Sequence, residues 1–433
     1  MRTRALPLVA LTLLSCNTST PSTPAPRSAE ASAPSARSGG DTSPPVQALA
    51  PVPFSEVRLR KALADGDVPA LAALLDAEPE ALERPIDGTP PLLLAALGGQ
   101  LPAVEMLCKR GVHLDARSQD GATALHYAAE FGHAELVGLL LKRGASVDAV
   151  DKQNETALHH AARKNEVRSL NALLAAGASM EARTRLGQTP LLLAMEYGQR
   201  EAALSLIDKG ADVRAADMHG NTPLHWEARG GGGGLTERLL AKGADLEARD
   251  RESQTPLHCA ASRGDVTFVA LLLTRGAAIG ALDQDGRTPL HLAARDDRVG
   301  LVELLLDRGA SIDARDAAGR TALFIASGNR RTRYMEEFGV PELDIPPTSH
   351  ALPPEGPPAL VKLLLKRGAS AAAKDREGNT PLHHAAEVGV IDVARLLLQQ
   401  GSARNVRNNA GKTPVDLARA NGQQDLVALL AKP

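Results

Sequence analysis

The chain has 433 residues, of which 49 are Lys or Arg and 51 are Asp or Glu, and its formal net charge is −2. This balance removes the electrostatic case for nucleic-acid binding, which requires a basic surface. Aromatic residues make up only 2% of the sequence, so we expect a core of Leu and Ala side chains and not an aromatic cluster.

The N-terminus differs in pattern from the rest of the chain. Two arginines precede an apolar run over residues 5–14 that is too short to span a bilayer. The run ends in Leu13-Leu14-Ser15-Cys16. This motif resembles the lipobox of bacterial lipoproteins, which implies that residues 1–15 are a signal peptide and that Cys16 is lipidated as the first mature residue. An ordinary secretory signal cleaved elsewhere is the alternative, and it also exports the protein.

A polar segment follows the cysteine. Residues 17–53 are rich in Ser, Thr, Pro and Ala and have almost no large apolar side chain. Such a segment cannot offset the entropy of ordering, so we expect residues 16–54 to form a lipidated, flexible tether. Asn17 is not the Asp that retains lipoproteins at the inner membrane in the best-known sorting systems. We therefore expect the periplasmic side of the cell envelope, with the outer membrane favoured.

The remaining chain is repetitive. A threonine recurs every 33 residues at Thr123, Thr156, Thr189, Thr222, Thr255, Thr288 and Thr321, and again at Thr380 and Thr413. It is followed by Pro-Leu-His or Ala-Leu-His in most units, then by an Ala pair, a Leu-rich run and a Gly-Ala step. A fixed period of this kind indicates stacked supersecondary units that are stable only against their neighbours.

The pattern within each unit predicts two helices. Threonine caps a helix, and the proline after it suits the first helical turn because its missing N–H needs no partner there. The glycine after the Leu-rich run fits a helix C-terminus with positive φ, and the polar residues beyond it fit a turn. Residues 56–84 lack the threonine signature but predict a helix pair at the start of the array.

Together these motifs resemble the ankyrin repeat over roughly residues 56–433. The resemblance implies an all-α repeat solenoid with short hairpin fingers, spanning residues 55–433, with about ten repeats after the N-terminal helix pair. The repeats begin near residues 85, 118, 151, 184, 217, 250, 283, 316, 375 and 408.

The histidines and cysteines are interpreted within this frame. Six histidines fall in the repeat signature, and the ankyrin resemblance implies that each bonds the backbone of the adjoining turn. Adjacent residues on a helix point about 100° apart, so the pairs His159-His160 and His383-His384 cannot jointly chelate an ion, and we expect no metal. Cys108 and Cys259 lie five layers apart, beyond the reach of a disulfide, so we expect free thiols.

No catalytic constellation emerges from the sequence. It has no Gly-rich phosphate loop after a strand, no Gly-x-Ser-x-Gly elbow and no carboxylate pair outside the repeat frame. The glycine run over residues 230–234 falls between two helices of one repeat and lacks the residues that phosphate chemistry requires. We therefore expect neither an enzyme nor a cofactor.

The ankyrin resemblance implies binding of a partner protein on the concave side, through finger tips and the exposed end of each first helix. We expect the protein itself to be a monomer. The candidate contact residues at those positions and in the insertion described below are Phe131, Arg163, Lys164, Tyr197, His219, Arg229, Arg263, Arg295, Tyr334 and Phe338. For Tyr127 and Trp226 the sequence leaves open whether they are binding anchors or pack between layers.

Two units depart from the pattern. The step from Thr321 to Thr380 is 59 residues, so the eighth repeat holds an insertion at about residues 328–358, placed between its two helices. Within the insertion we expect a short helix over 329–338. The sequence leaves open whether the insertion is a functional loop or a neutral one.

In the fifth repeat Glu227 replaces an alanine, and the glycine run enters the second helix. This repeat is therefore predicted to be the weakest layer, either as a hinge or by degeneration.

The sequence thus predicts an exported, membrane-anchored protein that binds a partner protein through its concave face. A specific inhibitor or protective partner of an enzyme or toxin is one alternative. An intracellular ankyrin regulator is the other, if the N-terminus is not cleaved.

Overall fold

A computed structural model describes residues 54–232, 234–328 and 359–431. Within these ranges the chain forms 22 α-helices and no β-strand, which confirms the predicted all-helical repeat fold. The predicted signal, Cys16 and the tether lie outside the described residues, and so do Tyr334, Phe338 and the predicted helix over 329–338.

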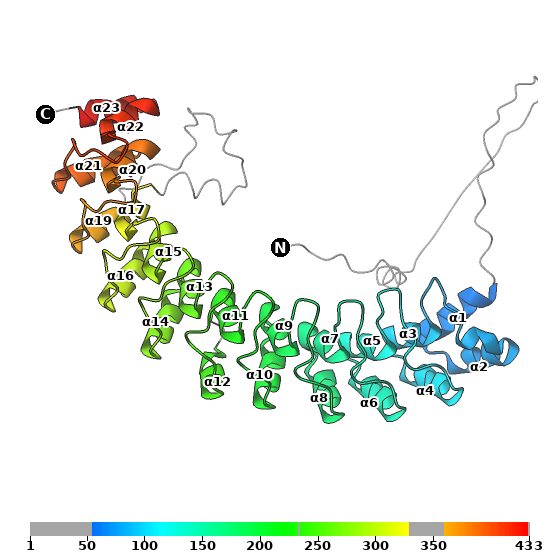
Figure 1. Cartoon of the computed structure of the whole chain (residues 1–433). Helices are drawn as coiled ribbons and strands as arrows, with labels where there is room; N and C mark the ends of the chain where they lie inside the picture. Colours follow the sequence, from blue (N-terminus) through cyan, green and yellow to red (C-terminus); the bar gives the residue numbers. More distant parts are fainter. Residues whose placement is uncertain (1–53, 233, 329–358, 432–433) are drawn as a thin grey trace, which may run out of the picture. The chain divides into compact units, whose positions relative to one another are not determined.

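The array starts with the predicted helix pair, α1 (Phe54–Asp65) and α2 (Val68–Ala77), followed by the short 3-10 helix η1 (Pro79–Leu82). Each repeat then contributes a first, inner helix and a second, outer helix, which Figure 1 shows as two rows. The inner helices are α3 (Pro91–Leu97), α5 (Ala124–Glu130), α7 (Ala157–Lys164), α9 (Pro190–Glu196), α11 (Pro223–Gly230), α13 (Pro256–Arg263), α15 (Pro289–Arg295), α17 (Ala322–Ala326), α20 (Pro381–Val388) and α22 (Pro414–Ala420). The outer helices are α4 (Leu101–Lys109), α6 (Ala134–Lys142), α8 (Val167–Ala175), α10 (Arg200–Asp208), α12 (Thr236–Ala241), α14 (Val266–Thr274), α16 (Val299–Asp307), α19 (Ala359–Lys366), α21 (Ile391–Gln399) and α23 (Gln424–Leu430).

The signature histidines explain how successive repeats are joined. In the third repeat the backbone N–H of Thr156 donates to Nδ1 of His159 at 3.1 Å, while Nε2 of His159 bonds the carbonyl of Gln188 in the next repeat at 3.1 Å. The other signature histidines bond in the same way, at His126, His225, His258, His291 and His383. The predicted bond to the adjoining turn is confirmed in all six repeats.

Four repeats lack this histidine, and in two of them, the fourth and the eighth, the threonine hydroxyl alone caps the inner helix. Leu192 and Phe324 stand at its position, and their backbone N–H groups donate to the hydroxyls of Thr189 and Thr321, respectively, at 3.3 Å. The threonine therefore caps the helix in either case. What these two repeats lose is the side-chain bond to the next repeat.

The turn before each inner helix, here called a finger, is fixed by its own first residue. Asp151 accepts the backbone N–H groups of Gln153 at 2.7 Å and Glu155 at 2.9 Å. Consecutive fingers are also bonded to each other through the backbone, as between Met218 N–H and the Leu186 carbonyl at 2.9 Å. The finger tips therefore form a continuous bonded row along the array.

Every second repeat adds an arginine to this row of fingers. Arg183 donates to the carbonyl of Gly187 in its own finger at 2.8 Å and to that of Ala216 in the next repeat at 2.7 Å. Arg117, Arg249 and Arg315 make the equivalent pair of bonds. These side chains hold neighbouring fingers in fixed register.

The core consists of leucine and alanine layers that form two clusters. One cluster runs from Leu59 to Leu239, and the other holds Ala228 and continues from Leu257 to Leu430. The change from one cluster to the other falls in the fifth repeat. Its outer helix α12 has six residues, whereas the flanking outer helices α10 and α14 have nine each. The helix begins about one turn later than its counterparts because the glycine run occupies its start, and the weakness of this layer stays a prediction.

The glycine run adopts a conformation that other residues resist. Gly231 and Gly232 have φ of +98° and +63°, and a Cβ on Gly232 would lie 2.6 Å from the ring of Phe268. Glu227, 5% exposed, accepts the N–H of Leu235 at 2.8 Å and so caps α12 from within the same repeat. The unusual glutamate and the unusual glycines therefore belong to one local structure.

The described residues also bear on the cysteines, the insertion and the length of the helices. Cys108 and Cys259 are free thiols, as predicted. Residues 329–358 of the predicted insertion lie outside the described residues, which end at 328 after α17 and resume at 359 with α19, so its place stays a prediction. None of the helices in the described ranges combines the length and the apolar character needed to cross a membrane.

Candidate functional site

The predicted aromatic contacts lie at the ends of inner helices. Phe131 and Tyr197 are the C-cap residues of α5 and α9 and are 41% and 49% exposed. Lys164, whose side chain is 41% exposed, occupies the same position in the repeat between them. Because these three residues are 33 apart in consecutive units, they form one row across α5, α7 and α9. The row combines two apolar surfaces with a cation.

The predicted arginines are also brought to this side, but each has a partner within the array. Arg163 donates to Glu155 at 2.6 Å and its side chain is only 17% exposed. Arg229 pairs with the buried Asp250 at 3.0 Å, and Arg263 donates to the carbonyl of Arg229 at 2.8 Å. Arg295 pairs with Asp296 at 3.0 Å. Their role as partner contacts stays a prediction. Lys164 also has a partner within the array, since its Nζ lies 3.5 Å from Glu130.

The finger tips hold His219, which is exposed as the prediction requires, and two apolar residues beside it. Met218 is 41% exposed and Leu186, on the preceding finger, is 44% exposed. Leu186 was not among the predicted contact residues. The sequence does contain a signal for it, because the other fingers carry polar or small residues at this tip position.

Tyr127 and Trp226 are partly buried and pack against the leucine core of the first cluster. The indole N–H of Trp226 is buried without a hydrogen-bond partner. These contacts support packing between layers, the second of the two roles that the sequence left open.

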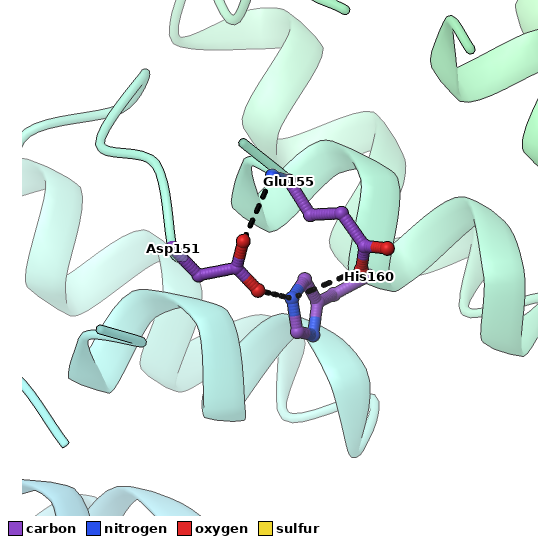
Figure 2. Close-up of side chains that lie close together, drawn as sticks. All are labelled: Asp151, Glu155 and His160. Carbon is purple, nitrogen blue, oxygen red and sulfur yellow. Dashed lines mark hydrogen bonds and ion pairs between the residues drawn. The ribbon is translucent and has the colours of Figure 1, made fainter. Parts of the chain in front are cut away.

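A compact charged cluster lies where the second and third repeats meet. His160 is 6% exposed; its Nδ1 lies 3.2 Å from Glu130 and its Nε2 lies 3.3 Å from Asp151. Figure 2 shows Asp151, Glu155 and His160 converging, with Asp151 and Glu155 from one finger and His160 from the helix that follows it. Glu130 comes from the end of α5, in the preceding repeat.

The cluster favours a charged imidazole. Burial lowers the pKa of His160, but hydrogen bonds to Asp151 and Glu130 outweigh burial and the nearby Arg163 and raise it. Burial likewise opposes ionisation of the two carboxyls, yet their bonds to His160 hold the pKa of Glu130 and that of Asp151 at about 2. The second and third repeats are therefore joined by a buried ion-pair network.

The same three side chains also offer a candidate metal site. Asp151, Glu155 and His160 each place one ligand atom within 4.8 Å of the others, a donor set that suits zinc or manganese. A metal ion needs a neutral imidazole and free carboxylates. It would have to displace the proton of His160 and the guanidinium of Arg163, which donates to Glu155 at 2.6 Å. The arrangement fits a structural ion-pair network better than a metal centre.

Comparison with family models identifies the repeats. The model "Ankyrin repeats (3 copies)" matches residues 59–151, 144–217, 214–283, 261–337 and 350–433. The chain belongs to the ankyrin-repeat family. The curated proteins give no match. Ankyrin arrays generally act as binding scaffolds for other proteins and not as enzymes, so the family implies a protein partner.

The chemistry of the described residues agrees with a scaffold. Cys259 is buried on the ankyrin inner helix α13, and burial raises the pKa of its thiol to about 11. A thiol with that pKa holds almost no thiolate near neutral pH, and the thiolate is the nucleophilic form. Burial also lowers the pKa of the signature histidines, to about 4 for His126 and His159, so these imidazoles are neutral structural groups.

Proposed function

We propose that this ankyrin protein is exported, held at a membrane by a lipid on Cys16, and binds a partner protein through the face made by its fingers and inner helices. The observation that carries the binding role is the exposure of Phe131 and Tyr197 at equivalent positions two repeats apart. Large aromatic side chains are typical energetic anchors of protein interfaces. With aromatics at only 2% of the chain, two exposed at one repeat position favour selection for contact.

The location is supported by the sequence of the N-terminus. Leu13-Leu14-Ser15-Cys16 follows a short apolar run, and a polar segment over 17–53 separates the cysteine from the array. A tether of that composition would let the array reach a partner away from the membrane surface.

The anchor is tested by labelling with palmitate in a bacterial host that processes lipoproteins. We expect the wild-type chain to take up label and to sediment with membranes, and the Cys16→Ala variant to do neither. A wild-type chain that keeps its first residues and takes up no label contradicts the anchor and favours an intracellular ankyrin regulator.

The binding role is tested by crosslinking and pull-down from membranes, with mass spectrometry of the captured proteins. We expect a defined partner for the wild-type chain and its loss for Phe131→Ser combined with Tyr197→Ser. The matched control is Val266→Ser, because Val266 is 42% exposed at the start of the outer helix α14. Equal capture by all three chains contradicts the proposed binding face, provided that circular dichroism shows the same helicity.

A further inference from the structure

Three neighbouring finger tips carry an apolar and cationic surface, here called the fingertip ridge and defined by Lys152, Arg185, Leu186, Met218 and His219. All five residues are exposed. The fingers that carry them are bonded in sequence, from Arg185 N–H to the Gln153 carbonyl and from Met218 N–H to the Leu186 carbonyl, each at 2.9 Å. The ridge is therefore a preorganised surface that needs little ordering on binding.

The apolar part of the ridge has no counterpart on the other described fingers. Leu186 and Met218 are 44% and 41% exposed on backbones that bond directly to each other. At the two tip positions the first finger has Ile86-Asp87, whose isoleucine is buried. The later fingers outside the ridge have the polar or small pairs Gln119-Asp120, Arg251-Glu252, Gln284-Asp285, Ala317-Ala318, Arg376-Glu377 and Asn409-Ala410. Two adjacent large apolar side chains left in water mark a place that a partner covers.

The charge of the ridge indicates what that partner carries. Neither Lys152 nor Arg185 has an ion pair with another described residue. On the sixth and ninth fingers, by contrast, Arg251 and Arg376 are each followed by a glutamate. Two cations without a carboxylate partner, beside an apolar pair, complement a segment that is both acidic and apolar.

We propose that the fingertip ridge binds a linear acidic segment of the partner protein, with carboxylates opposite Lys152 and Arg185 and large apolar side chains over Leu186 and Met218. This inference rests on the proposed function, because it names the kind of segment that the array recognises. A lipid surface fits less well. Two cations contribute only about 2 kcal/mol at an anionic membrane, and lipid-binding patches use clusters of about four to eight basic residues.

The test selects short random peptides displayed on phage against the full chain and measures the affinity of the enriched peptides by fluorescence anisotropy. We expect enrichment of sequences with Asp or Glu around Leu, Phe or Trp, and weaker binding at higher salt. Leu186→Ser with Met218→Ser should weaken binding by about tenfold, which is about 1.4 kcal/mol. Lys152→Glu with Arg185→Glu should weaken it by a similar factor.

The control variants carry serine or glutamate at the equivalent tip positions of other fingers. Ala317→Ser with Ala318→Ser, and separately Arg376→Glu, should leave the affinity unchanged. Enrichment of basic or uncharged peptides, or equal affinity in the ridge variants, overturns the inference. The inference is also overturned if no peptide is enriched and the wild-type chain, but not the ridge variants, binds phosphatidylglycerol vesicles. Dimerisation that light scattering detects and that the ridge variants lose would overturn it as well.

The outcomes also separate this inference from the proposed function. If capture of the native partner depends on Phe131 and Tyr197 and the ridge variants capture it normally, the proposed function stands and the ridge inference fails. If crosslinking from membranes yields no partner for the wild-type chain, the proposed function fails independently of any peptide result.

Discussion

Adjacent histidines have opposite roles in the third repeat because a helix turns by about 100° per residue. His159 points toward the next repeat, where it bonds the Gln188 carbonyl, and burial keeps it neutral with a pKa of about 4. His160 lies among Glu130, Asp151, Glu155 and Arg163. Its hydrogen bonds to Asp151 and Glu130 raise its pKa despite its burial and the nearby Arg163. One residue type thus supplies both a neutral link and a charged one between repeats.

The neutral histidines predict a loss of stability in acid. The folded-state pKa of His126 and of His159 is about 4, below the ordinary 6.5 of the unfolded chain. Their contribution is fully present above pH 6.5 and is lost as the pH falls toward 4, because the unfolded chain gains protons first. Each contributes on the order of 3 kcal/mol to that loss. Urea unfolding followed by circular dichroism at pH values across this window measures it.

A glutamine at the signature position isolates this effect. His126→Gln should reduce the loss of stability in acid, because glutamine can still cap the helix at this position but does not titrate in this range. The matched control is His219→Gln on an exposed finger tip, which should leave the loss unchanged. Stability that is constant or rises on acidification would contradict the prediction.

Arg163 gives a second residue-level prediction. Its guanidinium donates to Glu155, whose side chain is only 7% exposed. Arg163→Met keeps most of the packing but removes the shorter of the two charge contacts of this carboxylate and leaves it only His160, at 3.5 Å. We therefore expect a loss of about 3 kcal/mol in the free energy of unfolding. The control Lys164→Met removes a neighbouring cation that is 41% exposed and should cost less than about 1 kcal/mol. Equal, small losses in urea unfolding would show that Arg163 is free for the binding role that the sequence assigns to it.

At the scale of single elements, the sequence predicted what depends on local rules. In the second to tenth repeats the inner helix begins after the threonine, as α7 does after Thr156, and the glycine after the outer helix has positive φ, as at Gly144. Both features follow from capping and from backbone sterics within a few residues. The predicted place of the insertion rests on the repeat period and on the Leu-rich run at 360–365.

The sequence did not predict features that need a contact between separate segments. The His160 cluster combines a finger, the helix after it and Glu130 from the preceding repeat, so no local spacing reveals it. The bond from Leu235 to Glu227 depends on the path of the glycine loop, which glycine leaves undetermined. For the same reason the sequence identified Glu227 only as a departure from the repeat and not as a cap.

The fifth repeat gives the prediction at this scale. We expect backbone amides of α12 to exchange faster than those of α8, α14 and α16, because α12 is shorter and packs less extensively against its outer neighbours. Glu227→Ala restores the alanine of the repeat pattern, yet it should destabilise α12 further by about 1 to 3 kcal/mol, because the Leu235 N–H is left buried without an acceptor.

Hydrogen exchange read by mass spectrometry compares the four outer helices in one experiment. Equal protection of all four would remove the basis for a hinge and leave the glycines as an ordered loop. Unchanged exchange of α12 in the Glu227→Ala variant would show that the carboxylate does not cap this helix.

At the scale of the whole array, stability in a repeat protein is roughly a sum of unit terms and of interfaces between neighbours. The inner helices pack continuously from α3 to α17 and from α17 to α22 through α20. The core nevertheless divides into two clusters at the fifth repeat, where the outer helix is short. The connection between the two parts therefore rests mainly on the inner helices and fingers, and we expect two unfolding transitions.

Equivalent leucines in the two clusters test this division. Leu173 on α8 and Leu305 on α16 occupy the same repeat position, and both are fully buried, one in each cluster. Truncation to alanine should cost each part about 2 to 5 kcal/mol through lost burial and the cavity left behind. In urea unfolding, Leu173→Ala should move one transition to lower urea and Leu305→Ala the other, while each leaves its companion in place. A single transition that both variants shift equally would show that the interface in the fifth repeat is strong enough to couple all ten repeats, and that the shortened α12 costs the array no cooperativity.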